Sequence, residues 1–156
     1  NPYQGLALVG RQGKDNMNNT HNHNLFRRVK NMQLPMGKYA LFGSAPMGAR
    51  GLKKCGDIDL IVDDEIWEEY KNKPGWNYQI TENGVEHIES DDSDIEIWHD
   101  WRPWYQTARQ FIDDTEIIDD LPFVKLTYVL EWKKKWGREK DMGDIEIIEK
   151  YLRDRE

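Results

Sequence analysis

Two aspartates separated by one residue, Asp57 and Asp59, have the clearest chemical potential in this chain. They lie in the run Gly-Asp-Ile-Asp-Leu-Ile-Val at residues 56–62, which is typical of a β-strand. Because side chains alternate along a strand, both carboxylates point to one face, while Ile58 and Leu60 point to the other. Burying unpaired charge in a central strand costs several kcal/mol, so the pair indicates a function. Its simplest chemistry is to hold a divalent metal ion.

A third carboxylate is expected from a later strand. Residues 94–98, Asp-Ile-Glu-Ile-Trp, alternate between polar or amphipathic and apolar side chains. Asp94 and Glu96 therefore share a face, and Glu96 is our first choice for the third acid, with Asp94 as the alternative. Three converging carboxylates repel one another, so at least one should have a raised pKa until a cation binds.

A glycine turn comes before the aspartate pair. Gly43 and Ser44 follow the apolar run 39–42 and come before a short segment that suits a helix with Ser44 as its N-cap. Glycine allows the backbone to approach a phosphate closely, and free amides at the start of a helix attract the same anion. Metal-binding carboxylates, phosphate-binding amides and a base for a hydroxyl are the parts that phosphoryl transfer requires.

The remaining pattern supplies a framework for these residues. Strands are expected at 38–42, 56–62, 76–80, 85–88 and 94–98, and helices at 25–32, 64–70, 105–111, 121–136 and 141–152. Lys125 and Lys133 on the 121–136 helix could reach phosphate oxygens, although lysines on helices are commonly only solvated. Asp141 is expected to cap the last helix outside the site. We expect residues 1–24 to form a loose polar N-terminal arm and residues 25–156 a single domain.

The residues from Leu41 to Leu60 resemble a known signature. Leu-Phe-Gly-Ser at 41–44, then twelve residues (45–56), then Asp-Ile-Asp-Leu at 57–60 are similar to the pattern of the DNA polymerase beta-like nucleotidyltransferase superfamily. Ile-Glu-Ile at 95–97 resembles the third-acid motif of that family, and residues 136–145 look like the C-terminal helices of its small members. The likeness covers about residues 37–153.

The resemblance implies an α/β (α+β) fold with a nucleotidyltransferase-like mixed β-sheet flanked by α-helices. It also implies a magnesium-dependent enzyme that transfers a nucleoside monophosphate from an NTP such as ATP, releasing pyrophosphate. Mn²⁺ would be an alternative cation. By resemblance, Asp57, Asp59 and Glu96 would be the catalytic metal ligands, and Gly43 and Ser44 would cradle the β and γ phosphates.

Composition restricts the acceptor. The chain has 29 acidic and 22 basic residues, for a formal charge of -7, which argues against binding along duplex nucleic acid. A small molecule, a protein side chain or an RNA end fits better. With one cysteine, no signal-peptide pattern and no long apolar stretch, we expect a cytoplasmic protein without a membrane partner.

Two other functions stay open. The first is a weakly active or inactive nucleotidyltransferase-like interaction module, such as one half of a toxin and antitoxin pair, with a protein partner or a second copy of the chain. The second is a metal-dependent phosphohydrolase, which uses similar carboxylates but does not need the Gly-Ser turn. The aromatic run 98–105 could stack a base, although burial as ordinary core and rim explains it better.

Overall fold

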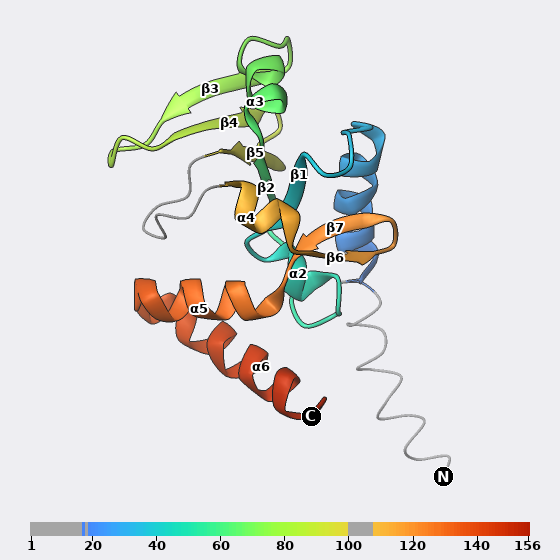
Figure 1. The fold of residues 1–156 in the computed structure, drawn as a ribbon, viewed down its shortest axis with the longest axis vertical. Helices are drawn as coiled ribbons and strands as arrows, with labels where there is room; N and C mark the ends of the chain where they lie inside the picture. The colour runs from blue at the N-terminus through green and yellow to red at the C-terminus, as the bar shows by residue number, and fades with distance from the viewer. Residues whose placement is uncertain (1–16, 18, 100–107) are drawn as a thin grey trace.

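A seven-stranded mixed β-sheet forms the centre of the part of the chain that the structure describes (Figure 1). The structure is a computed structural model, and it describes residues 17, 19–99 and 108–156. The strand order is β3-β4-β5-β2-β1-β7-β6. The strands are β1 (Tyr39–Phe42), β2 (Ile58–Val62), β3 (Trp76–Ile80), β4 (Glu86–Ser90), β5 (Ile95–Trp98), β6 (Thr115–Ile118) and β7 (Leu121–Val124). The expected combination of helices with a mixed sheet is present.

Helices lie on both sides of this sheet (Figure 1). None of those within the described residues is long and apolar enough to traverse a lipid bilayer. They are a helix at residues 19–31, α2 (Ala45–Gly48), α3 (Asp64–Lys71), α4 (Ala108–Asp113), α5 (Leu126–Trp136), the 3₁₀ turn η1 (Glu139–Asp141) and α6 (Met142–Arg153).

The central strands are apolar on both faces, and this accounts for two separate cores. Leu41 and Leu60 belong to a core that also includes the 19–31 helix and α3. Phe42 and Ile61 point the other way, into a core with residues of α4, α5 and α6. Asp59 lies two residues before Ile61, so the carboxylates belong to the face covered by these later helices.

Strand pairing brings the acidic strands together. β2 and β5 run parallel, and Asp59 is directly opposite Glu96. On its other side β2 pairs with β1 in the antiparallel direction, and Phe42, the residue before Gly43, is opposite Asp59. The sheet therefore places the glycine turn and the two acidic segments at one end of three neighbouring strands.

The first helix extends into the segment that the sequence led us to expect as an arm. It covers residues 19–31 rather than 25–32. Asn22 is only 2% exposed, donating to the Lys53 carbonyl at 2.9 Å and accepting from the Cys55 amide at 2.8 Å. These long-range hydrogen bonds stabilise the helix start, and local periodicity does not reveal them.

The expected helix at 121–136 was wrong in its first turn. Residues 115–118 and 121–124 form the hairpin β6-β7, and the helix begins only at Leu126. Asp119 and Asp120 both have positive φ angles, of 49° and 66°, which suits a tight two-residue hairpin turn. Pro122 would suit the first turn of the expected helix, but it lies in β7. Of the helix expected at 105–111, the described part is Ala108–Asp113, which continues past the expected end, and residues 105–107 lie outside the described residues.

Candidate active site

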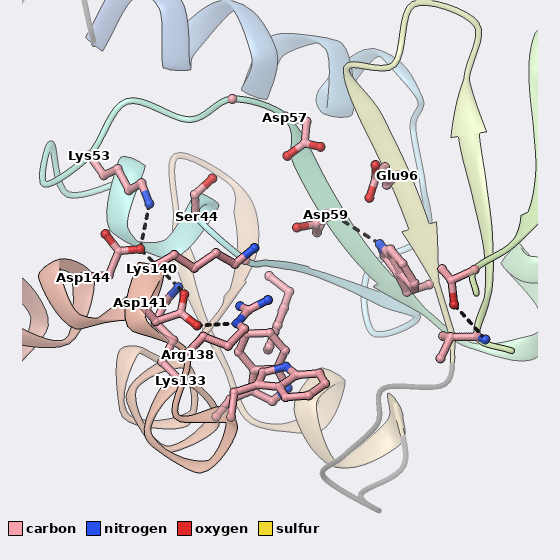
Figure 2. Close-up of a pocket in the computed structure, with 18 of the residues that line it drawn as sticks. Ser44, Lys53, Asp57, Asp59, Glu96, Lys133, Arg138, Lys140, Asp141 and Asp144 are labelled. Atoms are coloured by element: carbon pink, nitrogen blue, oxygen red, sulfur yellow. Dashed lines mark hydrogen bonds and ion pairs between the residues drawn. The ribbon is translucent and has the colours of Figure 1, made fainter. Parts of the chain in front are cut away.

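Asp57, Asp59 and Glu96 converge at the start of β2 and the middle of β5 (Figure 2). One carboxylate oxygen from each lies within 4.8 Å of the others, a spacing at which one cation could contact all three. Asp57 comes just before β2, Asp59 lies within it, and Glu96 reaches the pair from the parallel neighbour. The structure thus brings together the three acids that the sequence singled out.

The site raises the pKa of each of these carboxylates. Burial is the main cause for Asp59, whose pKa lies well above the ordinary value, followed by repulsion from Asp57 and Glu96. Burial also raises the pKa of Asp57 and of Glu96, and Asp57 adds repulsion at Glu96. The ionised cluster is therefore unfavourable by itself, and a bound cation would relieve it.

Trp98 orients Asp59. Its indole Nε1 donates to Asp59 Oδ1 at 3.2 Å, from the strand that also carries Glu96. The Trp98 ring is stacked on the His87 imidazole, with centroids 4.7 Å apart and an interplanar angle of 18°. This contact leaves the other carboxylate oxygen, Oδ2, to face the Gly43 turn.

Gly43 is required at that turn for two separate reasons. Its φ of +64° lies in the left-handed region that side chains disfavour. A Cβ atom at this position would also lie 2.4 Å from Asp59 Oδ2. The absence of a side chain therefore allows the turn and the carboxylate to approach each other.

Ser44 follows as the N-cap residue of α2, but its side chain makes no capping hydrogen bond. This differs from the capping role expected of it. Ser44 lines the same cavity as the acids, and Figure 2 shows its hydroxyl extending toward the side of Asp57. The loop that leads to Asp57 is fixed by the first helix, through Asn22 and through a 2.7 Å hydrogen bond between His21 Nε2 and the Cys55 carbonyl.

These residues line a cavity of about 630 Å³. The sheet contributes the acids and Trp98 to one wall, and the tip of the β3-β4 hairpin, with Thr81, Asn83 and Val85, contributes to its rim. The C-terminal segments and the loop before β2 supply the opposite wall. It has four cations and two acids: Lys53 from the loop, and Lys133, Arg138, Lys140, Asp141 and Asp144 from the C-terminal segments. Acidic and basic walls thus face each other across one cavity (Figure 2).

A network of ion pairs holds the basic wall in place. Lys133 Nζ lies 3.1 Å from Asp141 Oδ1 and 3.2 Å from Asp144 Oδ2, and all three residues are buried. Lys53 reaches Asp144 at 2.7 Å, and Arg138 reaches Asp141 at 2.6 Å. Three cations share two carboxylates, so the network keeps a net positive charge.

Asp141 is therefore part of the cavity wall, which corrects the expectation that it caps α6 outside the site. It is the N-cap residue, but its carboxylate makes no capping hydrogen bond. Burial acts to raise its pKa, yet the pKa is lowered because Arg138 and Lys133 donate hydrogen bonds to the ionised form. Its role is to orient these two cations.

Lys140 differs from its neighbours in this wall. It is exposed, and it forms no ion pair with any of the residues that the structure describes. In Figure 2 its side chain extends along the cavity toward the acidic wall. Its ammonium group is available to an incoming anion.

Lys125 and Asp94 are not brought to the site. Lys125 is the N-cap residue of α5, and its ammonium lies 2.6 Å from Asp114. Asp94 accepts from Arg28 on the first helix at 2.7 Å, outside the acidic cluster. Glu96 rather than Asp94 thus joins the aspartate pair.

Sequence reasoning missed most of the basic wall. Lys53, Arg138 and Lys140 lie in loops or in η1, where no periodicity marks them. The available signal was the dense charge pattern Gly-Arg-Glu-Lys-Asp-Met-Gly-Asp at 137–144, at the junction of two helices. Of the aromatic run 98–105, Trp98 lines the cavity, and residues 100–105 lie outside the described residues.

Comparisons of the chain with family models, curated proteins and solved structures gave no match. The chemistry of this cavity is therefore the basis for a function.

Proposed function

We propose that the chain is a metal-dependent nucleotidyltransferase, which moves a nucleoside monophosphate from an NTP to an acceptor hydroxyl and releases pyrophosphate. The observation that carries the proposal is the convergence of three carboxylates beside a glycine turn, in a cavity whose opposite wall is cationic. The resemblance of residues 41–60 to the polymerase beta-like signature supports the same reaction.

The donor set fits Mg²⁺ or Mn²⁺. All three groups offer carboxylate oxygens, which are the ligands that hard divalent cations prefer. The pKa values of Asp57, Asp59 and Glu96 are raised, so their ionised forms are unfavourable by themselves, and a bound cation would stabilise them. When bound, such a cation supplies charge neutralisation at the reacting phosphate.

The opposite wall fits the triphosphate. Lys140 can contact phosphate oxygens as a mobile point charge, and Arg138 offers a planar donor group beside it. Arg138 is also held over the Trp132 ring, with 5.1 Å from its Cζ atom to the ring centroid. The backbone of the Gly43 turn lies close enough to Asp59 for a phosphate group to contact both the turn and a cation held by Asp59.

Groups of this chain and its substrates account for each bond and proton in the transfer step. The acceptor oxygen bonds to the α phosphorus, and the bond from that phosphorus to the bridging oxygen breaks, so that pyrophosphate leaves. Glu96 is placed to accept the hydroxyl proton, because it faces Asp59 across the strand pair and is half-buried at the cavity wall. The basic wall stabilises the charge that develops on the departing pyrophosphate.

Pyrophosphate release tests this proposal. The protein would be incubated with each labelled NTP, Mg²⁺ or Mn²⁺, and a cell extract as the source of acceptor. We expect labelled acceptor and pyrophosphate in equal amounts, both absent with Asp57→Asn. Binding to one extract protein without turnover would instead indicate an interaction module, and release of inorganic phosphate alone would indicate a phosphohydrolase.

A further inference from the structure

A second group of possible metal ligands lies next to the acidic triad. In β4 and β5, which pair antiparallel, Glu89 is directly opposite Glu96. His87 is two residues before Glu89, so it lies on the same face of the sheet. One ring nitrogen of His87 and one carboxylate oxygen each from Glu89 and Glu96 lie within 4.8 Å of one another. Glu96 thus belongs to both groups.

His87 is buried with an unused nitrogen. It is 9% exposed, and its Nδ1 has no hydrogen-bond partner among the described residues. A buried polar atom without a partner costs roughly 1–3 kcal/mol, so most such atoms in proteins are satisfied. The Trp98 ring stacked against the imidazole restricts its position beside the two carboxylates.

Glu89 and Glu96 also lack a compensating partner among the described residues. Two like charges directly opposite each other across a strand pair are destabilising. No Lys or Arg within the described part of the chain forms an ion pair with either carboxylate. Neither is part of the basic wall, which lies across the cavity. An imidazole with an unused nitrogen and two carboxylates without a cationic partner form a ligand set.

We propose that His87, Glu89 and Glu96 bind a divalent transition-metal cation, Mn²⁺ or Zn²⁺, at a second site, which shares only Glu96 with the group formed by Asp57, Asp59 and Glu96. Imidazole nitrogen is a good ligand for these borderline cations, whereas Mg²⁺ prefers oxygen ligands alone. Metal–ligand distances are about 2.1 Å, so small side-chain rotations would complete the contacts. The proposal concerns binding of the cation alone and stands whether or not the chain transfers nucleotides.

Electron spin echo spectroscopy of bound Mn²⁺, without nucleotide, tests the site. It detects a directly coordinated nitrogen, which the carboxylate triad cannot supply. We expect the nitrogen modulation in the wild-type protein, its loss in His87→Gln, and its retention in the Asp57→Asn, Asp59→Asn double variant. Glu89→Gln, which keeps the histidine, should weaken Mn²⁺ binding at this site at least about tenfold.

His99→Gln is the matched control, because His99 packs against Trp67 and belongs to neither ligand group. It should leave the nitrogen signal unchanged. Absence of the signal in the wild-type protein, or its persistence in His87→Gln, would overturn the proposal. Loss of the signal in the double aspartate variant would place the nitrogen ligand at the triad and would overturn the separate site. Glu89→Gln should weaken Mn²⁺ binding even if His87→Gln fails to fold, and unchanged affinity would contradict the ligand set.

Discussion

Asp59 is held by the fold as a carboxylate in surroundings that favour its neutral form. Apolar β2 residues flank it on both sides, Asp57 and Glu96 repel it, and the Trp98 indole is its hydrogen-bond donor. Such a cluster lowers the stability of the cation-free protein, and it is retained at functional sites because a ligand compensates for it.

Asp59→Asn should therefore stabilise the cation-free protein while removing activity. The amide keeps an acceptor oxygen for Trp98 and removes one charge from the cluster. We expect the free energy of unfolding at pH 7.5 to rise by roughly 0.5–2 kcal/mol, as is common when functional strain is relieved. Pyrophosphate release should fall by several orders of magnitude. Urea denaturation and a pyrophosphate assay would measure the two effects.

Asp94→Asn is the matched control for this change. Asp94 lies near the start of β5 but accepts from Arg28 rather than joining the cluster. Its substitution should leave the transfer reaction intact and should reduce stability by at most about 1 kcal/mol, because the ion pair is partly exposed. Equal loss of activity in both variants would contradict the role of the converging triad.

Gly43→Ala tests the close approach of the turn to Asp59. The alanine would face both a left-handed backbone and a 2.4 Å contact of its Cβ with Asp59 Oδ2. Gly37→Ala provides the comparison, because its φ is +85° but nothing lies within 4 Å of its Cβ. The control should cost about 1–2 kcal/mol from backbone strain, and Gly43→Ala at least about 1 kcal/mol more from steric overlap. Equal losses by urea denaturation would show that the contact is unimportant.

Among the secondary-structure elements, α5, η1 and α6 together position most of the residues of the basic wall. The buried pairs of Lys133 with Asp141 and Asp144 tie α5 to the start of α6, and Arg138 and Lys140 lie at the junction between them. The cations in the ion-pair network are fixed by carboxylates, whereas Lys140 stays available to the ligand.

Lys140→Gln should weaken triphosphate binding without destabilising the fold. Lys140 is exposed, so removing its charge should change stability little. Loss of one charge-assisted contact with phosphate predicts roughly a tenfold rise in the dissociation constant of a nonhydrolysable NTP, an effect that should shrink in high salt. Titration calorimetry would measure it. Lys150→Gln, on the exposed side of α6 and outside the cavity, should change the constant little; a tenfold rise there would point to nonspecific charge effects.

Strands β2 and β5 were predictable from the sequence, whereas the hairpin β6-β7 was not. The two-residue period of β2 and β5 is local, and it correctly placed Asp57, Asp59 and Glu96 on one face. The hairpin β6-β7 was missed, although the β-branched residues of 115–118 and the Asp119-Asp120 turn were visible, because Pro122 also suits a first helical turn.

Long-range contacts could not be predicted from such local periodicity. Asn22 and His21 are hydrogen-bonded to a loop more than thirty residues away, so a polar, aperiodic segment suggested an arm where the fold has a helix. Likewise, Lys133 was singled out and Lys140 was not, because a helix has a period and a 3₁₀ turn at a helix junction does not.

In the molecule as a whole, the site depends on segments near both ends of the part of the chain that the structure describes. The first helix fixes the loop before Asp57, and the last helices face the acids across the cavity. A ligand that bridges the two walls should therefore stabilise the whole domain, since it binds the folded state only.

Mg²⁺ should raise the melting temperature, and the rise should depend on pH. The folded-state pKa values of Asp57, Asp59 and Glu96 lie above the ordinary 3.8 and 4.5, so the folded protein binds protons more tightly than the unfolded chain. Stability of the cation-free protein thus falls as pH rises from about 4 through these raised values. Mg²⁺ competes with those protons, so calorimetry should show a larger rise at pH 7.5 than at pH 4.5. No rise at either pH in saturating Mg²⁺ would contradict a metal site.

Crystallography with Mn²⁺ and a nonhydrolysable NTP provides the decisive test of the proposed metal and phosphate sites, because anomalous scattering locates the cation. We expect an Mn²⁺ peak in contact with Asp57, Asp59 and Glu96, and phosphate density between the Gly43 turn and Lys140. Phosphates bound elsewhere, or the absence of any cation peak in contact with Asp57 and Asp59, would contradict the proposed function.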